Sequence, residues 1–187
     1  MPRKVDHQER RTQIADALMR VAAEQGLEAV SLRHVAAEAG VSAGMVQHYF
    51  RTKDEMMRFA LEAVHVRSEA RVNAAIAALG PDPAPRPLLR TLLTALLPLD
   101  DESRAIGRVA LAFLAYTAVR PSGDPSLNEG TAQMAGFITA LLPAPDPARA
   151  AGLLALMEGL GLYLLGGQYT AEQALSALDA HLDLLFS

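Results

Sequence analysis

Residues 30–53, VSLRHVAAEAGVSAGMVQHYFRTK, constrain the fold of this chain more than any other stretch. Apolar residues recur there at the three- and four-residue spacing of a short helix, and Gly40 follows as a left-handed stop. Ser42 then provides an N-cap for a second short helix, whose apolar side carries Val46 and Phe50. Two short helices joined by a glycine-containing turn predict a helix-turn-helix.

The other side of the second short helix has no charged residue of the kind that solubilises an exposed helix. It carries Ala43, Gly44, Met45, Gln47 and His48. Small residues let a helix backbone approach another surface closely, and the major groove of DNA accepts such a helix by its N-terminal end. We therefore expect this helix to read DNA bases.

Several short runs in this region stand at a characteristic spacing without a gap. They are SLRHVA at 31–36, AGVS at 39–42, Gly44, Tyr49-Phe50 and KDE at 53–55. Through them the chain resembles the TetR/AcrR family of one-component transcriptional regulators. The resemblance includes specific motifs over residues 8–60, and beyond them it is limited to the pattern of helices. The order His48-Tyr49-Phe50 resembles the BetI-like branch, whereas Val46 and Gln47 depart from the Leu and Tyr that are commonest in the family.

The resemblance implies an all-α homodimer with about nine helices per chain. A helix-turn-helix DNA-binding domain is expected over residues 1–53, and an effector-binding and dimerisation domain over residues 54–187. The implied partners are a double-stranded DNA operator and a small-molecule effector. The resemblance implies that DNA is contacted by Arg33, Ser42, Ala43, Gly44, Met45, Gln47, His48, Tyr49 and Lys53.

Charge is distributed unevenly along the chain, although its formal total is only −4. Through residue 60 there are nine Lys and Arg against eight acids, whereas from residue 61 onward there are eight Arg against thirteen acids. An acidic body repels DNA at long range, so binding must come from locally clustered cations and shape fit. The N-terminal cations are either simply solvated or, as we favour, phosphate contacts; they are Arg3, Lys4, Arg10 and Arg11.

Length and composition exclude several classes of protein. A chain of 187 residues can bury a real core, and the absence of Cys excludes disulfides, thiolate metal sites and cysteine nucleophiles. No apolar stretch follows the basic N-terminus, so we expect no secretory signal. The longest apolar run, 148–167, is interrupted by Arg149 and Glu158 and indicates a buried helix rather than a membrane span. We expect a soluble cytoplasmic protein.

No pattern of catalytic residues is present. The five His residues are scattered, and no His-Glu-x-x-His, Gly-x-Ser-x-Gly or phosphate-loop sequence occurs. We therefore predict no enzymatic activity, no cofactor and no metal site. The remaining alternative is a helical dimerisation or scaffold protein that does not bind DNA specifically.

Helical periodicity and turn residues divide the rest of the chain. We predict a helix over residues 8–25, ended by Gly26, and a long helix that starts at a Thr52–Glu55 capping box and runs to about residue 79. The run GPDPAPRP at 80–87 is predicted to be a loop, because proline lacks an amide donor and fixes its torsions. Further helices are expected over 88–97, 102–119 and 126–142, from Asp146-Pro147, and from a capping box at Thr170–Gln173.

An effector cavity is expected between the long fourth helix and the helices that follow it. Each apolar candidate for its lining is, taken alone, more often an ordinary core residue. Glu158 is an acid within an apolar helix, and it is either a paired structural carboxylate, which we favour slightly, or the receptor of a cationic ligand. The candidate residues are His65, Phe113, Tyr116, Met134, Phe137, Met157 and Glu158.

The last two predicted helices are apolar enough to predict a dimer in which each chain contributes the same surface. The helix after Pro147 has apolar residues on every side, so it needs cover all round, and Gly152, Gly159 and Gly161 would permit close helix approach. A wholly intramolecular core is the alternative. The predicted interface residues are Leu153, Leu156, Leu160, Tyr163, Leu164, Leu175, Leu178, His181, Leu182 and Leu185.

Overall fold

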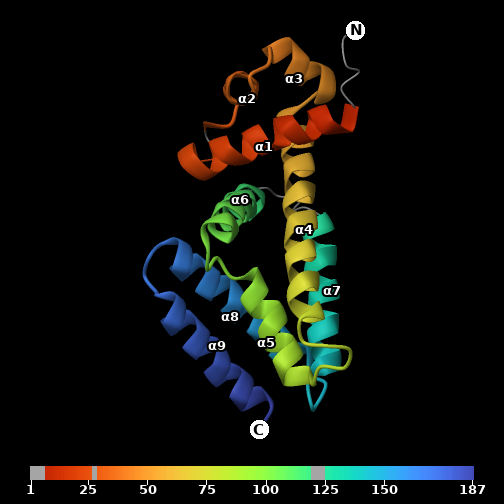
Figure 1. The fold of residues 1–187 in the computed structure, drawn as a ribbon, viewed down its shortest axis with the longest axis vertical. Coiled ribbons are helices and arrows are strands. Elements are labelled where there is room, and N and C mark those ends of the chain that lie inside the picture. The colour runs from red at the N-terminus through yellow and green to blue at the C-terminus, as the bar shows by residue number, and fades with distance from the viewer. Residues whose placement is uncertain (1–6, 27–28, 119–124) are drawn as a thin grey trace. The chain divides into compact units, whose positions relative to one another are not determined.

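The computed structural model describes residues 7–26, 29–118 and 125–187, and within these ranges the chain forms nine α-helices and no β-strand (Figure 1). The all-α prediction is confirmed. The helices are α1 (His7–Gln25), α2 (Leu32–Ala39), α3 (Ala43–Tyr49), α4 (Lys53–Ala77), α5 (Pro85–Leu96), α6 (Asp101–Ala118), α7 (Pro125–Leu141), α8 (Pro147–Leu165) and α9 (Ala171–Leu185).

The helices are grouped into two compact units. The first unit comprises Met1–Arg67 and Ala105–Val119, so it holds α1 to α3, the first part of α4 and most of α6. The second unit comprises Ser68–Arg104 and Arg120–Ser187, so it holds the rest of α4, α5, the start of α6, and α7 to α9. Two helices, α4 and α6, therefore have residues in both units.

Backbone caps set the ends of the first three helices as the sequence predicts. Gly26 and Gly40 adopt left-handed φ values of 79° and 66°. The hydroxyl of Ser42 accepts a hydrogen bond from the amide of Met45 at 3.1 Å, which confirms the predicted N-cap of α3. Helices α2 and α3, joined at Gly40, form the predicted helix-turn-helix.

Helix α1 packs against α2 through an apolar stripe and two polar contacts. The side-chain amide of Gln13 donates to the carbonyl of Ala39 at the end of α2 (3.0 Å), and Arg20 Nε pairs with Glu38 Oε1 (2.5 Å). The buried apolar residues of α1 to α3 and of the cap after α3 include Ile14, Ala17, Leu18, Val21, Ala22, Val35, Ala36, Val46 and Phe50.

Helix α4 begins at the predicted capping residues, but its glutamate reaches back one residue further than expected. The amide of Glu55 donates to Thr52 Oγ1 at 3.1 Å, which confirms the cap. Glu55 Oε2, however, accepts a hydrogen bond from the amide of Arg51 (2.9 Å) instead of that of Thr52. The carboxylate therefore also fixes the segment that links α3 to α4.

Helix α5 begins earlier than the sequence predicts. We expected a loop through residue 87, but Ala84 is the N-cap and Pro85 lies in the first helical turn. The expected loop is wrong there because the first-turn amides of a helix have no intrahelical partner, so proline removes no bond from that position.

The core of the second unit is formed by α5, α7, α8 and α9. The predicted caps of the last two helices are confirmed: Asp146 Oδ1 accepts from the amide of Ala148 (2.8 Å), and Thr170 and Gln173 exchange reciprocal hydrogen bonds at 2.9 and 3.2 Å. The buried core residues are Leu89, Leu92, Leu93, Leu97, Ile138, Leu142, Ala150, Leu153, Met157, Leu160, Leu164, Ala174, Leu178, Leu182 and Leu185.

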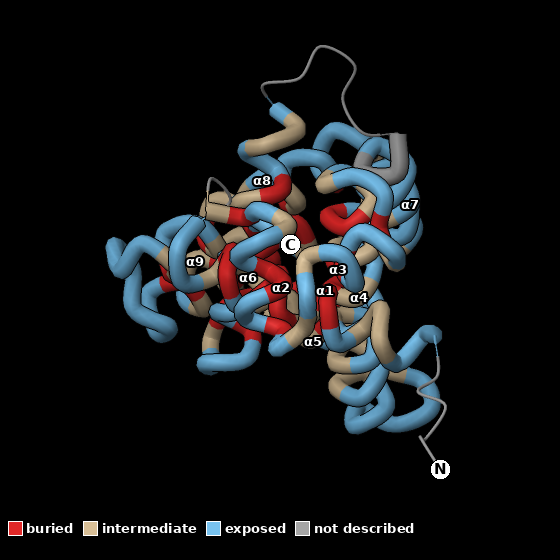
Figure 2. The backbone as a smooth tube through the Cα atoms, turned by 90° about the horizontal axis from the view of Figure 1, so that it is seen from above, coloured by how far each residue is buried: buried red, intermediate tan, exposed pale blue. Residues whose placement is uncertain are grey.

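Helix α8 has two apolar seams and is not covered all round (Figure 2). The inner seam is buried and consists of Ala150, Leu153, Met157, Leu160 and Leu164. The outer seam is exposed or half-buried and consists of Ala148, Gly152, Ala155, Gly159 and Leu162. Both seams advance in alternating steps of three and four residues, which is the spacing of one side of a helix. By length and composition α8 is the one helix of the described ranges that could cross a membrane, yet its inner seam belongs to a protein core.

Candidate nucleic-acid interface

Helix α3 presents its predicted DNA-reading residues on the surface. Val46 on α3 and Phe50 just after it are completely buried and anchor the helix, while Gly44, Gln47 and His48 are exposed on its other side. Ser42 and Met45 are also exposed, and Ala43 and Tyr49 are half-buried. The structure therefore brings the α3 candidates together on one accessible surface, which we call the α3 face: Ser42, Ala43, Gly44, Met45, Gln47, His48 and Tyr49.

Gly44 has no role in the packing of its own chain. A Cβ atom placed at this position would meet nothing nearer than Ser42 Oγ at 4.0 Å, and the residue does not have a positive φ. Glycine inside a helix is less favourable than alanine by about 1 kcal/mol. No contact within the described chain accounts for a glycine at position 44, and the space beside it is open.

An aromatic cluster lies at the C-terminal end of α3. The ring of Tyr49 is 4.7 Å from that of His7 at the start of α1 and 5.2 Å from that of His48, with the latter pair edge to face. These contacts support the half-buried Tyr49 ring from two sides and hold it at the edge of the α3 face. A phenol and an imidazole placed there can both hydrogen-bond to phosphate.

Three cations flank the α3 face. Arg33 on α2 is exposed and Lys53 at the start of α4 is half-buried. The structure adds Arg51, which is exposed in the short segment between α3 and α4. Sequence reasoning missed Arg51, although its position directly after Phe50 and before the Thr52 cap was the available signal.

Arg11 does not act as a free surface cation. Its guanidinium carbon lies 4.9 Å from the ring centre of Phe50 and 4.6 Å from that of Phe59, and Nη2 is 3.8 Å from Glu55 Oε1. The side chain therefore joins α1 to the end of α3 and the start of α4 by cation–π contacts and an ion pair. These contacts engage the guanidinium within the unit, and the phosphate contact of Arg11 stays a prediction. Arg10 is half-buried and donates to Gln13 (2.6 Å), and Arg3 and Lys4 lie outside the described residues.

The effector-pocket candidates divide between the two units. His65, Phe113 and Tyr116 belong to the first unit, where the Tyr116 hydroxyl donates to Asp54 Oδ1 (2.6 Å). Met134, Phe137, Met157 and Glu158 belong to the second unit, where Met157 is part of the core. A shallow depression lined by polar residues lies along α1 near Gln13 and Asp16, and none of the seven candidates lines it.

Glu158 has no hydrogen-bonding or ion-pairing partner among the described residues. The residue is exposed on α8, yet desolvation by surrounding protein raises the pKa of its carboxyl group above the usual value. No paired structural carboxylate of the kind we favoured is present within the described chain. Glu158 is therefore available to a ligand or to a second protein chain.

The predicted dimer residues fall into two groups. Six of the ten are buried in the core of their own unit, so their side chains are not available to a second copy: Leu153, Leu160, Leu164, Leu178, Leu182 and Leu185. Tyr163 is exposed, and Leu156, Leu175 and His181 are half-buried. Beside them the structure exposes the outer seam of α8 and Leu184 of α9, neither of which the sequence-based selection included.

Both parts of the chain match known protein families. Residues 14–58 match the family described as bacterial regulatory proteins, tetR family. Residues 85–187 match the family described as BetI-type transcriptional repressor, C-terminal, which confirms the branch that His48-Tyr49-Phe50 indicates. The resemblance therefore extends well beyond the helix-turn-helix.

Individual relatives agree with these matches. The HTH-type transcriptional regulator BetI of Burkholderia thailandensis is 31% identical over 194 residues, covering 100% of this chain and 98% of that protein. The HTH-type transcriptional regulator PksA of Bacillus subtilis is 37% identical over 116 residues, covering 62% of this chain and 55%, about half, of PksA. The crystal structure of a transcriptional regulator from Rhodococcus sp. Rha1 has a TM-score of 0.84 and 36% identity, covering 94% of this chain and 95% of that one.

Proposed function

The chain belongs to the TetR family of bacterial regulatory proteins, and we propose that it represses transcription from a near-palindromic operator and is released by a small-molecule effector. It is a DNA-binding regulator of the repressor type, and its relatives are transcriptional regulators rather than enzymes. Regulators of this family bind operators and effectors and act as dimers. The proposal assigns these roles to particular residues and places the protein in the cytoplasm.

The DNA-binding assignment rests mainly on the open space beside Gly44. Nothing in the chain requires a glycine there, but an α3 backbone that lies close to base edges does. The neighbouring exposed Gln47 can form two hydrogen bonds with adenine N6 and N7, and Arg33 can bind guanine or a phosphate. Ala43 and Met45 are suited to thymine methyl groups. The proposed phosphate contacts, which fix register without reading sequence, are Ser42, His48, Tyr49 and Lys53.

A second copy of the chain is the proposed occupant of the outer seam of α8. The seam is apolar and accessible, and Cβ atoms added at Gly152 or Gly159 would meet nothing within 4 Å in the same chain. Glycines on such a seam allow two helices to pack closely. Tyr163 on α8 and Leu184 on α9 are further exposed apolar residues of the second unit, at 44% and 72% exposure. Two copies related by a twofold axis would present two α3 helices to the two halves of a near-palindrome.

The proposed effector site includes Glu158. An effector shifts operator binding only if it binds one conformation better than another, and a coupling of about 1–3 kcal/mol lowers operator affinity about 5- to 150-fold. The unpaired carboxylate of Glu158 supports a role in binding a ligand that carries positive charge or hydrogen-bond donors. If Glu158→Gln left the response to every inducing compound unchanged, this assignment would be abandoned.

A gel-shift experiment tests the proposed function. The probe is DNA from upstream of the protein's own gene, and the control is a shuffled fragment of the same length and composition. We expect specific retardation with a Kd of about 10⁻⁸ M or lower at physiological salt. Equal retardation of both fragments, or none at micromolar protein, would favour a helical scaffold protein instead.

A further inference from the structure

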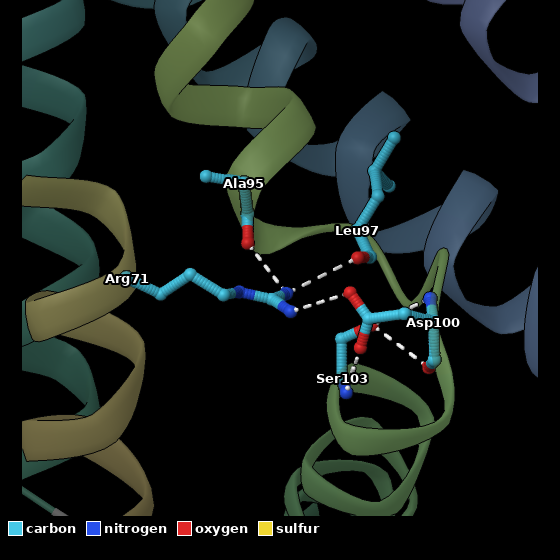
Figure 3. Close-up of polar contacts among 5 residues, drawn as sticks. All are labelled: Arg71, Ala95, Leu97, Asp100 and Ser103. Carbon is cyan, nitrogen blue, oxygen red and sulfur yellow. Dashed lines mark hydrogen bonds and ion pairs between the residues drawn. The ribbon is translucent and has the colours of Figure 1, made fainter. Parts of the chain in front are cut away.

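Arg71 on α4 binds three groups at the junction between α5 and α6 (Figure 3). Its Nη2 donates to the carbonyl of Ala95 at 2.7 Å and to that of Leu97 at 3.4 Å, and its Nη1 pairs with Asp100 Oδ2 at 3.1 Å. The two carbonyls lie at the C-terminal end of α5, where a helix has acceptors without intrahelical donors. The Leu97 carbonyl also accepts from the Leu99 amide at 2.9 Å. A single guanidinium thus binds the end of one helix and the start of the next.

The start of α6 is itself ordered around Asp100. Asp100 Oδ1 accepts from the amide of Ser103 (2.7 Å), and Ser103 Oγ accepts from the amide of Asp100 (3.0 Å). Ser103 is only 3% exposed, so its half of the reciprocal cap is shielded from water, whereas the Asp100 side chain is 61% exposed. These hydrogen bonds to Ser103, with a smaller contribution from Arg71, lower the pKa of the Asp100 carboxyl group. Asp100 is therefore ionised at neutral pH and remains a partner for the guanidinium.

The two helices that Arg71 joins are those that have residues in both compact units. The first unit ends at Arg67 within α4, and it resumes at Ala105 within α6. Arg71 and Asp100 both lie just on the second-unit side of these points. The contact therefore fixes α4 to the start of α6 near the places where both helices continue into the unit that carries α3.

We propose that Arg71 is a positioning residue for operator binding, which acts by holding α4 and α6 together at their entry into the DNA-binding unit. The inference rests on the proposed function. A continuous helix is stiff, so fixing one end restricts the direction of the other. A dimer binds both operator halves only when its two α3 helices have the matching separation. Loss of the contact lowers the fraction of molecules in that arrangement, and the apparent Kd rises by the same factor.

The second unit offers a matched control in Arg90. Its guanidinium binds the Asp179 carboxylate through two hydrogen bonds of 2.6 and 2.9 Å, and this pair joins α5 to α9. Both helices lie wholly within the second unit. Arg90→Ala therefore removes an Arg–Asp contact of at least equal quality without touching a helix that continues into the first unit.

The experiment compares wild type, Arg71→Ala and Arg90→Ala on an operator selected in vitro with the wild-type protein. Fluorescence anisotropy gives the Kd for this operator and for random-sequence DNA of equal length, and light scattering gives the oligomeric state. We expect Arg71→Ala to weaken operator binding about 5-fold or more while Arg90→Ala stays within about 2-fold. Binding to random DNA should be the same for all three proteins, because the α3 face is unchanged.

Two results would overturn the inference: wild-type operator affinity in Arg71→Ala, or equal weakening by Arg90→Ala. If Arg71→Ala does not fold, Asp100→Asn is the variant that tests the inference. It removes the ion pair with Arg71 but keeps an acceptor for the Ser103 amide. It must then weaken operator binding at an unchanged melting temperature, or the inference is rejected. Failure of the wild-type protein to select any operator would instead reject the proposed function, before any variant is measured.

Discussion

Helices α3 and α8 both carry glycines that their own chain does not need, and they differ in what surrounds those glycines. Gly44 of α3 lies beside the exposed polar residues Ser42, Gln47 and His48. Gly152 and Gly159 of α8 lie in a seam with alanines and Leu162. In all three places an added Cβ would have space, so the missing side chain leaves room for an external surface.

The comparison shows that exposed glycines indicate where a contact surface lies, and that the side chains beside them indicate which kind of partner fits it. Hydrogen-bonding groups beside a glycine match the donors and acceptors of base edges. Apolar residues beside glycines match another apolar helix, which can approach until backbones nearly touch. Under the proposed function, the same local feature would serve DNA reading in the first unit and self-association in the second.

A charge placed on the outer seam of α8 should have the largest effect on operator affinity. Leu162→Glu places a charge on the outer seam of α8, where the side chain is 47% exposed and contributes little to its own core. We expect monomers that lose about 10²-fold or more in operator affinity, because the two half-sites are no longer bound together. Leu114→Glu on α6, at a 49% exposed position, is the control and should remain dimeric. If the Leu162→Glu variant were still dimeric, the outer seam would not be the dimer interface.

Filling the space at Gly44 should separate stability from function. Gly44→Ala should raise the free energy of unfolding by about 0.5–1 kcal/mol, because alanine is the better helix former and has room here. Operator affinity should fall about 10-fold because the methyl group keeps α3 from the bases. Chemical denaturation and anisotropy measure the two effects. A variant that gains stability and keeps full affinity would show that α3 does not approach DNA at residue 44.

Gln47 should affect specificity rather than general affinity. Gln47→Ala removes a proposed bidentate contact, so discrimination at one base pair per half-site should fall by about 1–3 kcal/mol. Binding to a set of operator variants, each changed at one position, measures this loss. Uniform weakening on all of the variants would assign Gln47 to the phosphate backbone.

Lys53 should show the opposite pattern. Lys53→Ala should weaken binding to every sequence by a similar, smaller factor and reduce the slope of log K against log salt by about 1 per site. Titrations at several salt concentrations with operator and random DNA provide the test. Loss of preference for one base without a change in salt slope would contradict the phosphate assignment.

Replacing Glu158 should have the smallest effect, which is a change in folding stability that depends on pH. Its raised pKa means that the folded state holds the proton more tightly, so wild-type stability falls as pH rises from the ordinary value of about 4.3 through the folded pKa. Glu158→Gln should therefore match wild type below that window and have a slightly higher melting temperature at neutral pH. A lower melting temperature at neutral pH would indicate a paired carboxylate, whose pKa would be depressed.

The predictions that hold best concern residues whose effect is local. Gly40, Ser42, Asp146 and Thr170 act on amides and carbonyls within a few residues, so the chain order alone identifies their roles. The α3 face was predictable for the same reason, because one buried side of a short helix fixes which residues remain outside. Pro85 shows the limit, since the same residue can end a loop or open a helix.

The sequence by itself determined the helices, their caps and the residues that α3 presents. Only the tertiary structure decided which apolar seam of α8 is core and which is surface, because both seams have helical spacing and differ only in what packs against them. It also decided that Arg11 and Arg71 are used inside the protein. Their partners Phe59 and Asp100 are distant in the chain, and a charge shows its role only when its neighbours in space are known.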